Sequence, residues 1–516
     1  MSKLTRRRLV QGLTAAGVAV GAPLGVRWQR TRAADGAKDP RFLIVLAASG
    51  GGSIIDSLLA IRGSESANGD AINTFPDEEV LDIEGTPFRA VDLRRPTVGP
   101  IPIGFRSNQS EFVTRNRDDL MVATWTRTSV NHAVGQRRAV TGNEAWLGRT
   151  MQEIVANQYG AGFPLPNVHL ATDNAVSERG ADTTLPSFAF GETVADPALW
   201  PLALDGVKGL PRPVDRALVE RARTLRNDRL EPGSAFNRVF GRSARLAHWR
   251  RMRGAPQAAI EGGNLIDKLL LFPNSARFPL AEYGLTASED AERLLEVFPD
   301  VLTDPLDAQA ALAFLLLKNR VSVTVTLGPS FDVALREGAT LDLGSLTNGG
   351  SIDDYGDQII PEGSILNTPI AFDFSHQAHR ATQALMWDRV FRVAGGLIDL
   401  LKAEEYGNGE SFWDRTMIYV APDFGRSKRR PAGAPEFGSG HDLNNGIIAM
   451  SPMVNGNQVL GGVNPDTGLT YGFDPSTGQP DPGRNMDEPT IFAGLLQALG
   501  VDTAEAGLAD VPAMRS

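Results

Sequence analysis

Residues 41–57, RFLIVLAASGGGSIIDS, join an apolar run to a glycine-rich turn. The run covers 41–48, and the turn that follows it carries Asp56. An apolar strand that passes directly into a glycine-rich turn is typical of the start of an α/β sheet. Residues just past the carboxyl ends of parallel strands form the functional edge of such sheets. The stretch therefore predicts an α/β protein, with Asp56 as a first candidate site residue.

Strands and helices alternate on both sides of a distinct middle region. Residues 160–320 mix Pro-rich loops such as FPLPNVHL with helical segments such as AALAFLLLKN, which indicates an α-rich insertion or cap. The other predicted strands are 120–125, 321–328, 369–375, 415–425 and 444–452, and the predicted helices lie within 132–158, 376–403 and 488–501. The predicted parts are a signal peptide over 1–34, the core over 40–159 and 321–516, and the insertion over 160–320.

The composition is that of an ordinary globular protein. The chain has 516 residues, of which 42% are hydrophobic and 22% charged, so it can bury an ample core. It has no cysteine, which excludes disulfides, a thiolate nucleophile and a cysteine metal site. Any catalytic or metal site must therefore be built from oxygen and imidazole groups.

The first 34 residues resemble a twin-arginine export signal. Thr5-Arg6-Arg7-Arg8-Leu9-Val10 precedes a Gly/Ala-rich apolar stretch over 9–26, which is too short and too weakly apolar for a good membrane anchor. The alternative is a basic, disordered tail. The signal predicts a periplasmic or otherwise exported protein with the twin-arginine translocase as a partner and no integral membrane segment. That route carries folded proteins, often with a metal already bound.

Without the signal, the chain is strongly acidic. Residues 1–34 hold seven basic and no acidic residues, so 44 basic residues remain against 61 acidic ones, a net charge of −17. Such a surface repels nucleic acids and anionic membranes. The charge balance excludes both as main partners.

The triplet Asp423-Phe424-Gly425 matches the magnesium-binding motif of protein kinases, but its context does not. The sequence has no glycine-rich G-x-G-x-x-G loop upstream and no H-R-D catalytic loop. It also has no G-x-S-x-G motif of serine hydrolases. Asp423 is therefore better interpreted as one of several polar residues at strand ends.

These residues are of the types that bind zinc, manganese or magnesium. The predicted metal ligands are Asp56, Asp373, His376, Asp423 and His441. Each also has a structural interpretation: Asp373 could cap the helix that follows, His376 could pack against the sheet, and Asp56 and His441 could stabilise turns. A metal at this edge could polarise a phosphoryl or sulfuryl oxygen.

The order of these motifs resembles the alkaline-phosphatase/sulfatase superfamily and, more closely, the twin-arginine-exported family called domain of unknown function 1501. The matching motifs are a Gly-Gly turn with an aspartate (Gly51, Gly52, Asp56), an Asp/His pair before a long helix (Asp373, His376), an acid-F-G-R-S run (423–427) and a Gly-His-Asp element (440–442). The resemblance implies a three-layer sandwich with a mostly parallel central sheet and a hydrolase acting on phosphate or sulfate esters.

The chain departs from that superfamily in its catalytic positions. Where active relatives have a nucleophile about ten residues before a Thr-Gly pair, this chain has His132, with Ser129 nearby, so these two are the catalytic candidates. His132 could also be a metal ligand or a polar residue at the start of a helix. Phe424 stands where relatives have a metal-binding histidine. These departures keep open a second function, that of a non-catalytic exported binding or assembly protein with the same fold.

A basic run follows Asp423 directly. Arg426 and Lys428 are its candidates for binding the anionic group of a substrate, because arginine grips phosphate or sulfate with two parallel hydrogen bonds. The alternative for this run is a solvated loop.

Overall fold

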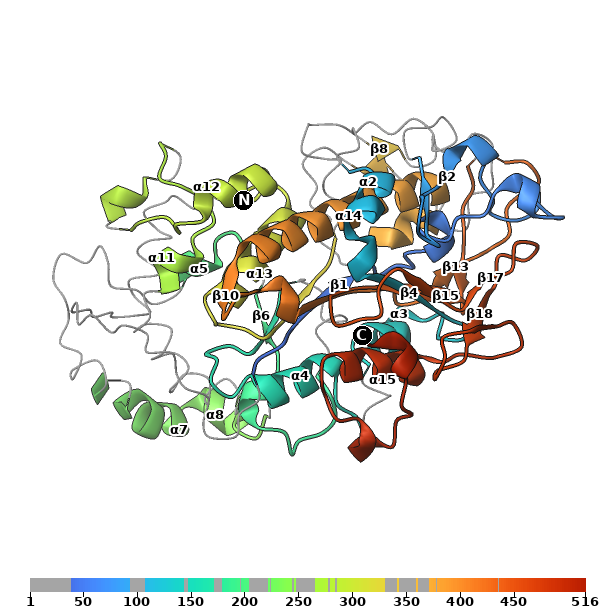
Figure 1. Ribbon diagram of the computed structural model, residues 1–516. Helices are drawn as coiled ribbons and strands as arrows, with labels where there is room; N and C mark the ends of the chain where they lie inside the picture. The colour runs from blue at the N-terminus through green and yellow to red at the C-terminus, as the bar shows by residue number, and fades with distance from the viewer. Residues whose placement is uncertain are drawn as a thin grey trace. The chain divides into compact units, whose positions relative to one another are not determined.

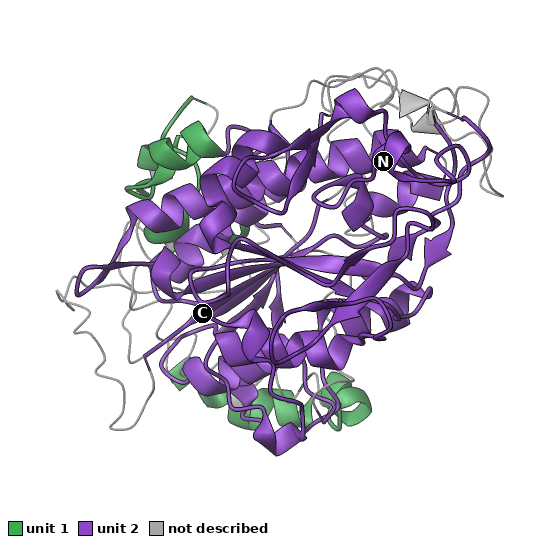
Figure 2. Ribbon diagram, turned by 45° about the vertical axis from the view of Figure 1, so that its right-hand side comes forward, with its two compact units in different colours: residues 1–37, 198–297 green, residues 38–197, 298–516 purple. Residues whose placement is uncertain are grey.

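The computed structural model describes residues 39–92, 107–142, 147–170, 179–194, 196–203, 221–222, 224–243, 246, 265–276, 279–283, 285–329, 341–342, 359–360, 371–376, 378–434 and 436–516. The predicted signal peptide, 1–34, lies outside these residues. The chain forms two compact units, one of residues 1–37 and 198–297 and one of residues 38–197 and 298–516 (Figure 2). No helix among the described residues is both long and apolar enough to cross a membrane.

The larger unit is built on an eight-stranded sheet. From edge to edge its strands are β16 (Gln458–Leu460), β4 (Leu120–Trp125), β15 (Asn445–Met450), β12 (Thr416–Ala421), β1 (Phe42–Ala47), β7 (Thr324–Leu327), β5 (Asn167–His169) and β6 (Glu192–Thr193). Only β15 runs antiparallel to its neighbours among these strands. The predicted α/β class with a mostly parallel central sheet is confirmed.

Helices cover both faces of this sheet (Figure 1). On one face lie α2 (Gln109–Asn116), α13 (Pro305–Lys318) and α14 (His379–Ala403), and on the other lie α4 (Met151–Tyr159) and α15 (Glu488–Ala498). Strands β1, β4, β12 and β15 are buried along their whole length, because helices on both sides exclude water from them. The apolar runs from which these strands were predicted are thus the core.

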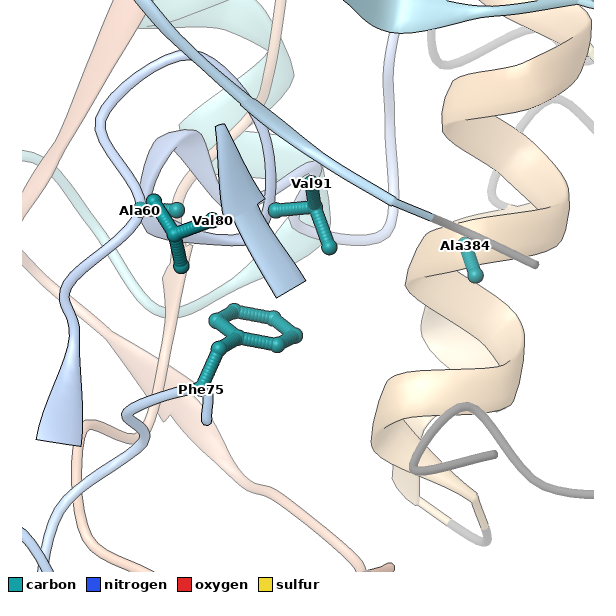
Figure 3. Packing of buried hydrophobic residues seen from close by; sticks show 5 residues of the cluster. All are labelled: Ala60, Phe75, Val80, Val91 and Ala384. Atoms are coloured by element: carbon teal, nitrogen blue, oxygen red, sulfur yellow. The ribbon is translucent and has the colours of Figure 1, made fainter. Parts of the chain in front are cut away.

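Smaller elements complete the larger unit. Short ribbons pair β2 (Val80–Asp82) with β3 (Arg89–Val91), β8 (Leu341–Asp342) with β9 (Ile359–Ile360), β10 (Glu405–Gly407) with β11 (Glu410–Ser411), β13 (Gly425–Arg426) with β14 (His441–Asp442), and β18 (Thr470–Phe473) with β17 (Gly462–Val463) and β19 (Pro480–Asp481). Phe75 packs with Ala60, Val80, Val91 and Ala384, which joins the β2–β3 ribbon to α14 (Figure 3).

One predicted strand is wrong, and two predicted helices differ in their bounds or continuity. Residues 371–376 form a 3₁₀ helix (Ala371–His376) instead of a strand, and α14 begins only at His379. The Phe372 amide donates to the Ser49 carbonyl, so this segment packs on the glycine turn and not in the sheet ladder. The helix predicted within 132–158 is divided into α3 (His132–Gly135), which continues as a π-helix over Gln136–Val140, and α4.

The predicted insertion over 160–320 is too broad. Strands β5 and β6 and helix α13 come from this range and belong to the sheet unit. The short parallel strands were missed because they lie in Pro-rich sequence. The other compact unit takes residues 198–297 of this range. Its described elements are helical, including α5 (Trp200–Ala203), α7 (Glu231–Gly233), α8 (Ala235–Phe240), α11 (Leu265–Leu269) and α12 (Ala291–Val297).

Candidate metal centre

Most of the predicted site residues lie at one end of the sheet strands, and this row of strand ends is the sheet edge meant below. Strands β1, β12 and β4 all end at this edge, because β15 is antiparallel to both β12 and β4 and β1 is parallel to β12. The residues that follow these three strands include the glycine turn, Asp423 and His132. His441 precedes β15, which starts at the same edge because it runs in the opposite direction.

Asp373 lies at the centre of a cluster of imidazoles. Its Oδ1 atom is 3.3 Å from Nε2 of His132, 3.3 Å from Nε2 of His376 and 3.1 Å from Nε2 of His441. The Nε2 atoms of His376 and His441 are themselves only 2.9 Å apart. Three imidazoles thus turn the same ring nitrogen towards one carboxylate.

In two of these histidines, the other ring nitrogen, Nδ1, contacts an oxygen atom outside the cluster. Nδ1 of His441 is 2.7 Å from the Val130 carbonyl oxygen, and Nδ1 of His132 is 2.8 Å from Oδ2 of Asp423. A carbonyl oxygen only accepts, so Nδ1 of His441 donates to Val130, and the Nε2 atom of His441 is turned towards the cluster. This arrangement, in which a carboxylate or carbonyl holds the outer nitrogen, is the one that orients histidine ligands in metal sites.

Asp423 is a supporting carboxylate in this geometry. It is fully buried, and its Oδ1 atom accepts from the amides of Gly50 (3.0 Å), Gly51 (2.9 Å) and Phe424 (3.1 Å). Gly50 and Gly51 have φ angles of 91° and 84°, a conformation that favours glycine. The glycine turn after β1 thus holds Asp423 in place, which leaves its Oδ2 atom for His132.

The imidazole and carboxylate atoms of the cluster suit a divalent metal that accepts nitrogen ligands. Zinc bonds of about 2.0–2.1 Å in a tetrahedron place neighbouring ligand atoms about 3.3 Å apart. The separations of Asp373 Oδ1 from Nε2 of His132 and from Nε2 of His441, 3.3 and 3.1 Å, match this value. The ligand atoms of His132, Asp373 and His441 all lie within 4.8 Å of one another. The two imidazoles of this group favour zinc over manganese or magnesium, which prefer oxygen.

The charges in the cluster depend on each other. Burial alone would raise the pKa of the Asp373 carboxyl, but hydrogen bonds from His132, His376 and His441 and the charge of Arg426 hold it well below its usual range. Burial would likewise lower the pKa of His132, but Asp373 and Asp423 raise it to about 9. Without a metal, His132 therefore carries both ring protons at neutral pH and bridges the two carboxylates.

Phe424 forms an apolar wall of the cluster. Its ring is fully buried and stacks on His441, with ring centres 4.1 Å apart and an angle of 30° between the planes. The centre of the His132 ring is 4.8 Å away. Phe424 thus excludes water from one side of the two imidazoles and supplies no ligand.

Asp56 lies in a different buried group from the Asp373 cluster. Its carboxylate accepts from Nε2 of His379 (3.0 Å) and from the Asn73 side-chain amide (3.0 Å). Burial lowers the pKa of His379, and the Nδ1 atom of this ring lies 2.7 Å from the Ser439 hydroxyl oxygen. Asp56 thus anchors, through His379, the loop that leads to His441.

Arg426 and Lys428, the predicted anion-binding residues, are both buried, so this part of the basic run is not a solvated loop. Arg426 donates to the carbonyls of Gly50 (2.9 Å) and Ser439 (2.9 Å), and its Nη2 atom lies 2.6 Å from Asp373. The Lys428 ammonium donates to the Asn444 carbonyl at 2.9 Å. Both cations satisfy backbone oxygens of the surrounding loops, which explains their burial.

Ser129 lies in the loop between β4 and α3. Its hydroxyl oxygen accepts from the Asn131 amide at 3.2 Å, and the next residue, Val130, supplies the carbonyl that holds His441. Ser129 is half-buried. None of its hydrogen bonds within the described part of the chain joins it to the Asp373 cluster, so its predicted catalytic role stays a prediction.

The sequence matches no protein-family model, and a search of curated proteins finds no match either. The site is therefore interpreted from its own geometry.

Metal affinity is expected to rise with pH. A metal that binds Nε2 of His132 must displace the proton that this atom carries below a pKa of about 9. This group alone should strengthen zinc binding about tenfold for each pH unit from about pH 7 upwards, and the gain should level off near pH 9. Calorimetric zinc titrations at several pH values, in buffers of different ionisation enthalpy, measure both the affinity and the proton released. An affinity independent of pH in this window would contradict the predicted proton on His132.

Proposed function

We propose that this chain is an exported, metal-dependent hydrolase of phosphate or sulfate esters, built on an alkaline-phosphatase-like fold. The observation that carries the proposal is the convergence of three imidazole Nε2 atoms on the Asp373 carboxylate at the sheet edge. Two resemblances support export by the twin-arginine translocase: that of the chain to the family called domain of unknown function 1501, and that of residues 1–34 to a twin-arginine signal. The substrate is a small-molecule or polymeric anionic ester.

The residues divide into ligands and supports. Asp373, His132 and His441 would hold the metal and leave a position open for water or substrate. The metal when bound would polarise the ester oxygen and lower the pKa of a bound water. Asp423 and the Val130 carbonyl keep the Nε2 atoms of His132 and His441 turned inward. The three ligand side chains are 19–27% exposed, so a substrate can reach them from solvent. Ser129 is the candidate for attack on the ester, since His132 is taken up as a ligand.

A non-catalytic metal-binding protein is the second candidate. The ion pair between Arg426 and Asp373 favours it, because the guanidinium neutralises the central carboxylate as in a structural ion pair. In that case the metal would stabilise the loops that meet at the sheet edge, and no ester would be turned over.

The two candidates differ in turnover at equal metal content. We expect purified full-length protein to carry one equivalent of metal and to hydrolyse members of a panel of aryl phosphates and aryl sulfates. Replacing Asp423 by alanine should reduce both metal content and turnover. Stoichiometric metal without turnover of any ester would favour the non-catalytic function. Protein that binds no zinc or manganese, even when either is added, would exclude the proposed hydrolase.

A further inference from the structure

A pocket of about 570 Å³ opens beside the amino-terminal end of α14. Residues of the segment 63–76 line it together with Arg380, Arg430 and Gly433, and none of these residues belongs to the Asp373 cluster. Its volume lies within the range of roughly 300–1,000 Å³ that is typical of small-molecule sites.

Arg380 is the buried cation of this pocket. It is 2% exposed, and its guanidinium lies 4.4 Å from the centre of the Phe75 ring and donates to the Thr74 carbonyl. Phe75 is held in turn by the apolar cluster that joins the β2–β3 ribbon to Ala384 of α14 (Figure 3). The guanidinium is therefore fixed in position by packing and not by a carboxylate.

Arg430 is the second cation and is half-buried. Its guanidinium donates to the carbonyls of Gly69 (2.8 Å) and Ala434 (3.2 Å). In the described part of the chain neither Arg380 nor Arg430 forms an ion pair, and the Nε atoms of both are buried without a hydrogen-bond partner. A buried cation without a directly paired carboxylate is costly, so an anion beside these two guanidinium groups would be stabilised.

The carboxylates nearby attract these charges but form no direct ion pair with them in the described part of the chain. Glu436 accepts from three backbone amides, those of Arg380 (2.8 Å), Ala381 (2.9 Å) and Phe437 (2.9 Å), and Asp70 is exposed. Burial lowers the pKa of Arg380 to about 10 against the attraction of Asp56, and the charge of Arg430 lowers it further. Because both arginines line the same pocket, their positive charges repel each other across it.

The walls of the pocket are already formed. The Arg430 amide donates to the Ala71 carbonyl at 3.1 Å, and the Gly433 amide donates to the Asp70 carbonyl at 3.1 Å. These bonds join the 63–76 segment to the loop that carries Arg430. A ligand would therefore bind without the entropic cost of ordering these two segments.

We propose that this pocket binds a small polar molecule through a phosphate or sulfate group held by Arg380 and Arg430. Guanidinium groups bind such oxyanions through paired, charge-assisted hydrogen bonds, and an oxyanion between the two arginines removes their repulsion. The volume leaves room for an organic part beyond the oxyanion. This binding site is independent of the metal centre and of the proposed hydrolysis.

The test is anion binding by full-length protein freed of metal with a chelator. Calorimetry with inorganic phosphate, inorganic sulfate and glycerol phosphate should show saturable binding of one equivalent. The Arg430→Gln variant should bind at least about tenfold more weakly. Arg429→Gln is the matched control, since it removes the same charge from an exposed neighbour that does not line the pocket. Tighter binding of glycerol phosphate than of phosphate would show that the organic part contributes.

Arg380 is not replaced in this test, because substitution of this buried side chain could disturb the fold. Binding to the folded Arg430→Gln variant therefore decides the result, and the His441→Ala variant should bind the anions like the wild type. The proposal is overturned if the wild type binds none of the three anions at millimolar concentration. It is also overturned if Arg430→Gln and Arg429→Gln weaken binding equally, which would indicate general surface attraction.

Discussion

Replacing His441 by alanine is expected to weaken zinc binding by more than about 100-fold, beyond the 10–100-fold typical of losing a supporting residue. The substitution removes one of the three Nε2 atoms that face Asp373 and leaves the other contacts of the carboxylate in place. His441 is partly exposed, with a side-chain exposure of 19%, so the fold should tolerate the loss. Competition between the protein and a chromophoric chelator measures the zinc affinity.

Asp442→Asn is the matched control for His441→Ala. Asp442 is the next residue, and its carboxylate accepts from the Asn444 amide instead of facing the cluster. We expect its zinc affinity to equal that of the wild type. Equal losses in both variants would indicate that the loop and not the imidazole determines binding, and an unchanged affinity in His441→Ala would remove this residue from the site.

Replacing Asp423 by asparagine is expected to lower zinc affinity about 10- to 100-fold without removing a ligand. The asparagine oxygen can still accept from Gly50 and Gly51, so the glycine turn should keep its place. The new NH₂ group would then face Nδ1 of His132, which must become an acceptor. The ring proton would move to Nε2, the atom that faces Asp373, and block it as a ligand.

The tautomer of His132 can be observed directly. Nitrogen NMR of the metal-free protein should show His132 doubly protonated in the wild type at neutral pH and as the neutral Nε2-protonated form in Asp423→Asn. Thermal unfolding of both proteins checks that the variant is folded. A folded variant with wild-type zinc affinity would contradict the role of Asp423 as the carboxylate that orients His132.

Much of the core could be predicted from the sequence because its signals are local. The predicted strands at 120–125 and 444–452 match β4 and β15 closely, and the predicted final helix contains α15. These segments are long apolar runs bounded by turn residues, so local pattern and tertiary burial agree. Asp373, His376, Asp423 and His441 were also predicted to meet, and the structure brings them together with His132.

The rest depends on contacts between distant segments. The apolar run 369–375 is too short for its periodicity to separate a strand from a helix, and its contact with the glycine turn determines the outcome. The pairing of Asp56 with His379 joins residues 323 positions apart. The basic run after Asp423 has the composition of a solvated loop, and only the folded arrangement of carbonyls explains the burial of Arg426.

A crystal of the full chain grown with zinc and recorded at the zinc absorption edge would locate the metal directly. We expect one anomalous peak in contact with Nε2 of His132, Nε2 of His441 and the Asp373 carboxylate. A zinc-saturated crystal without a peak at these three residues, or with zinc bound only elsewhere, would contradict the proposed metal centre.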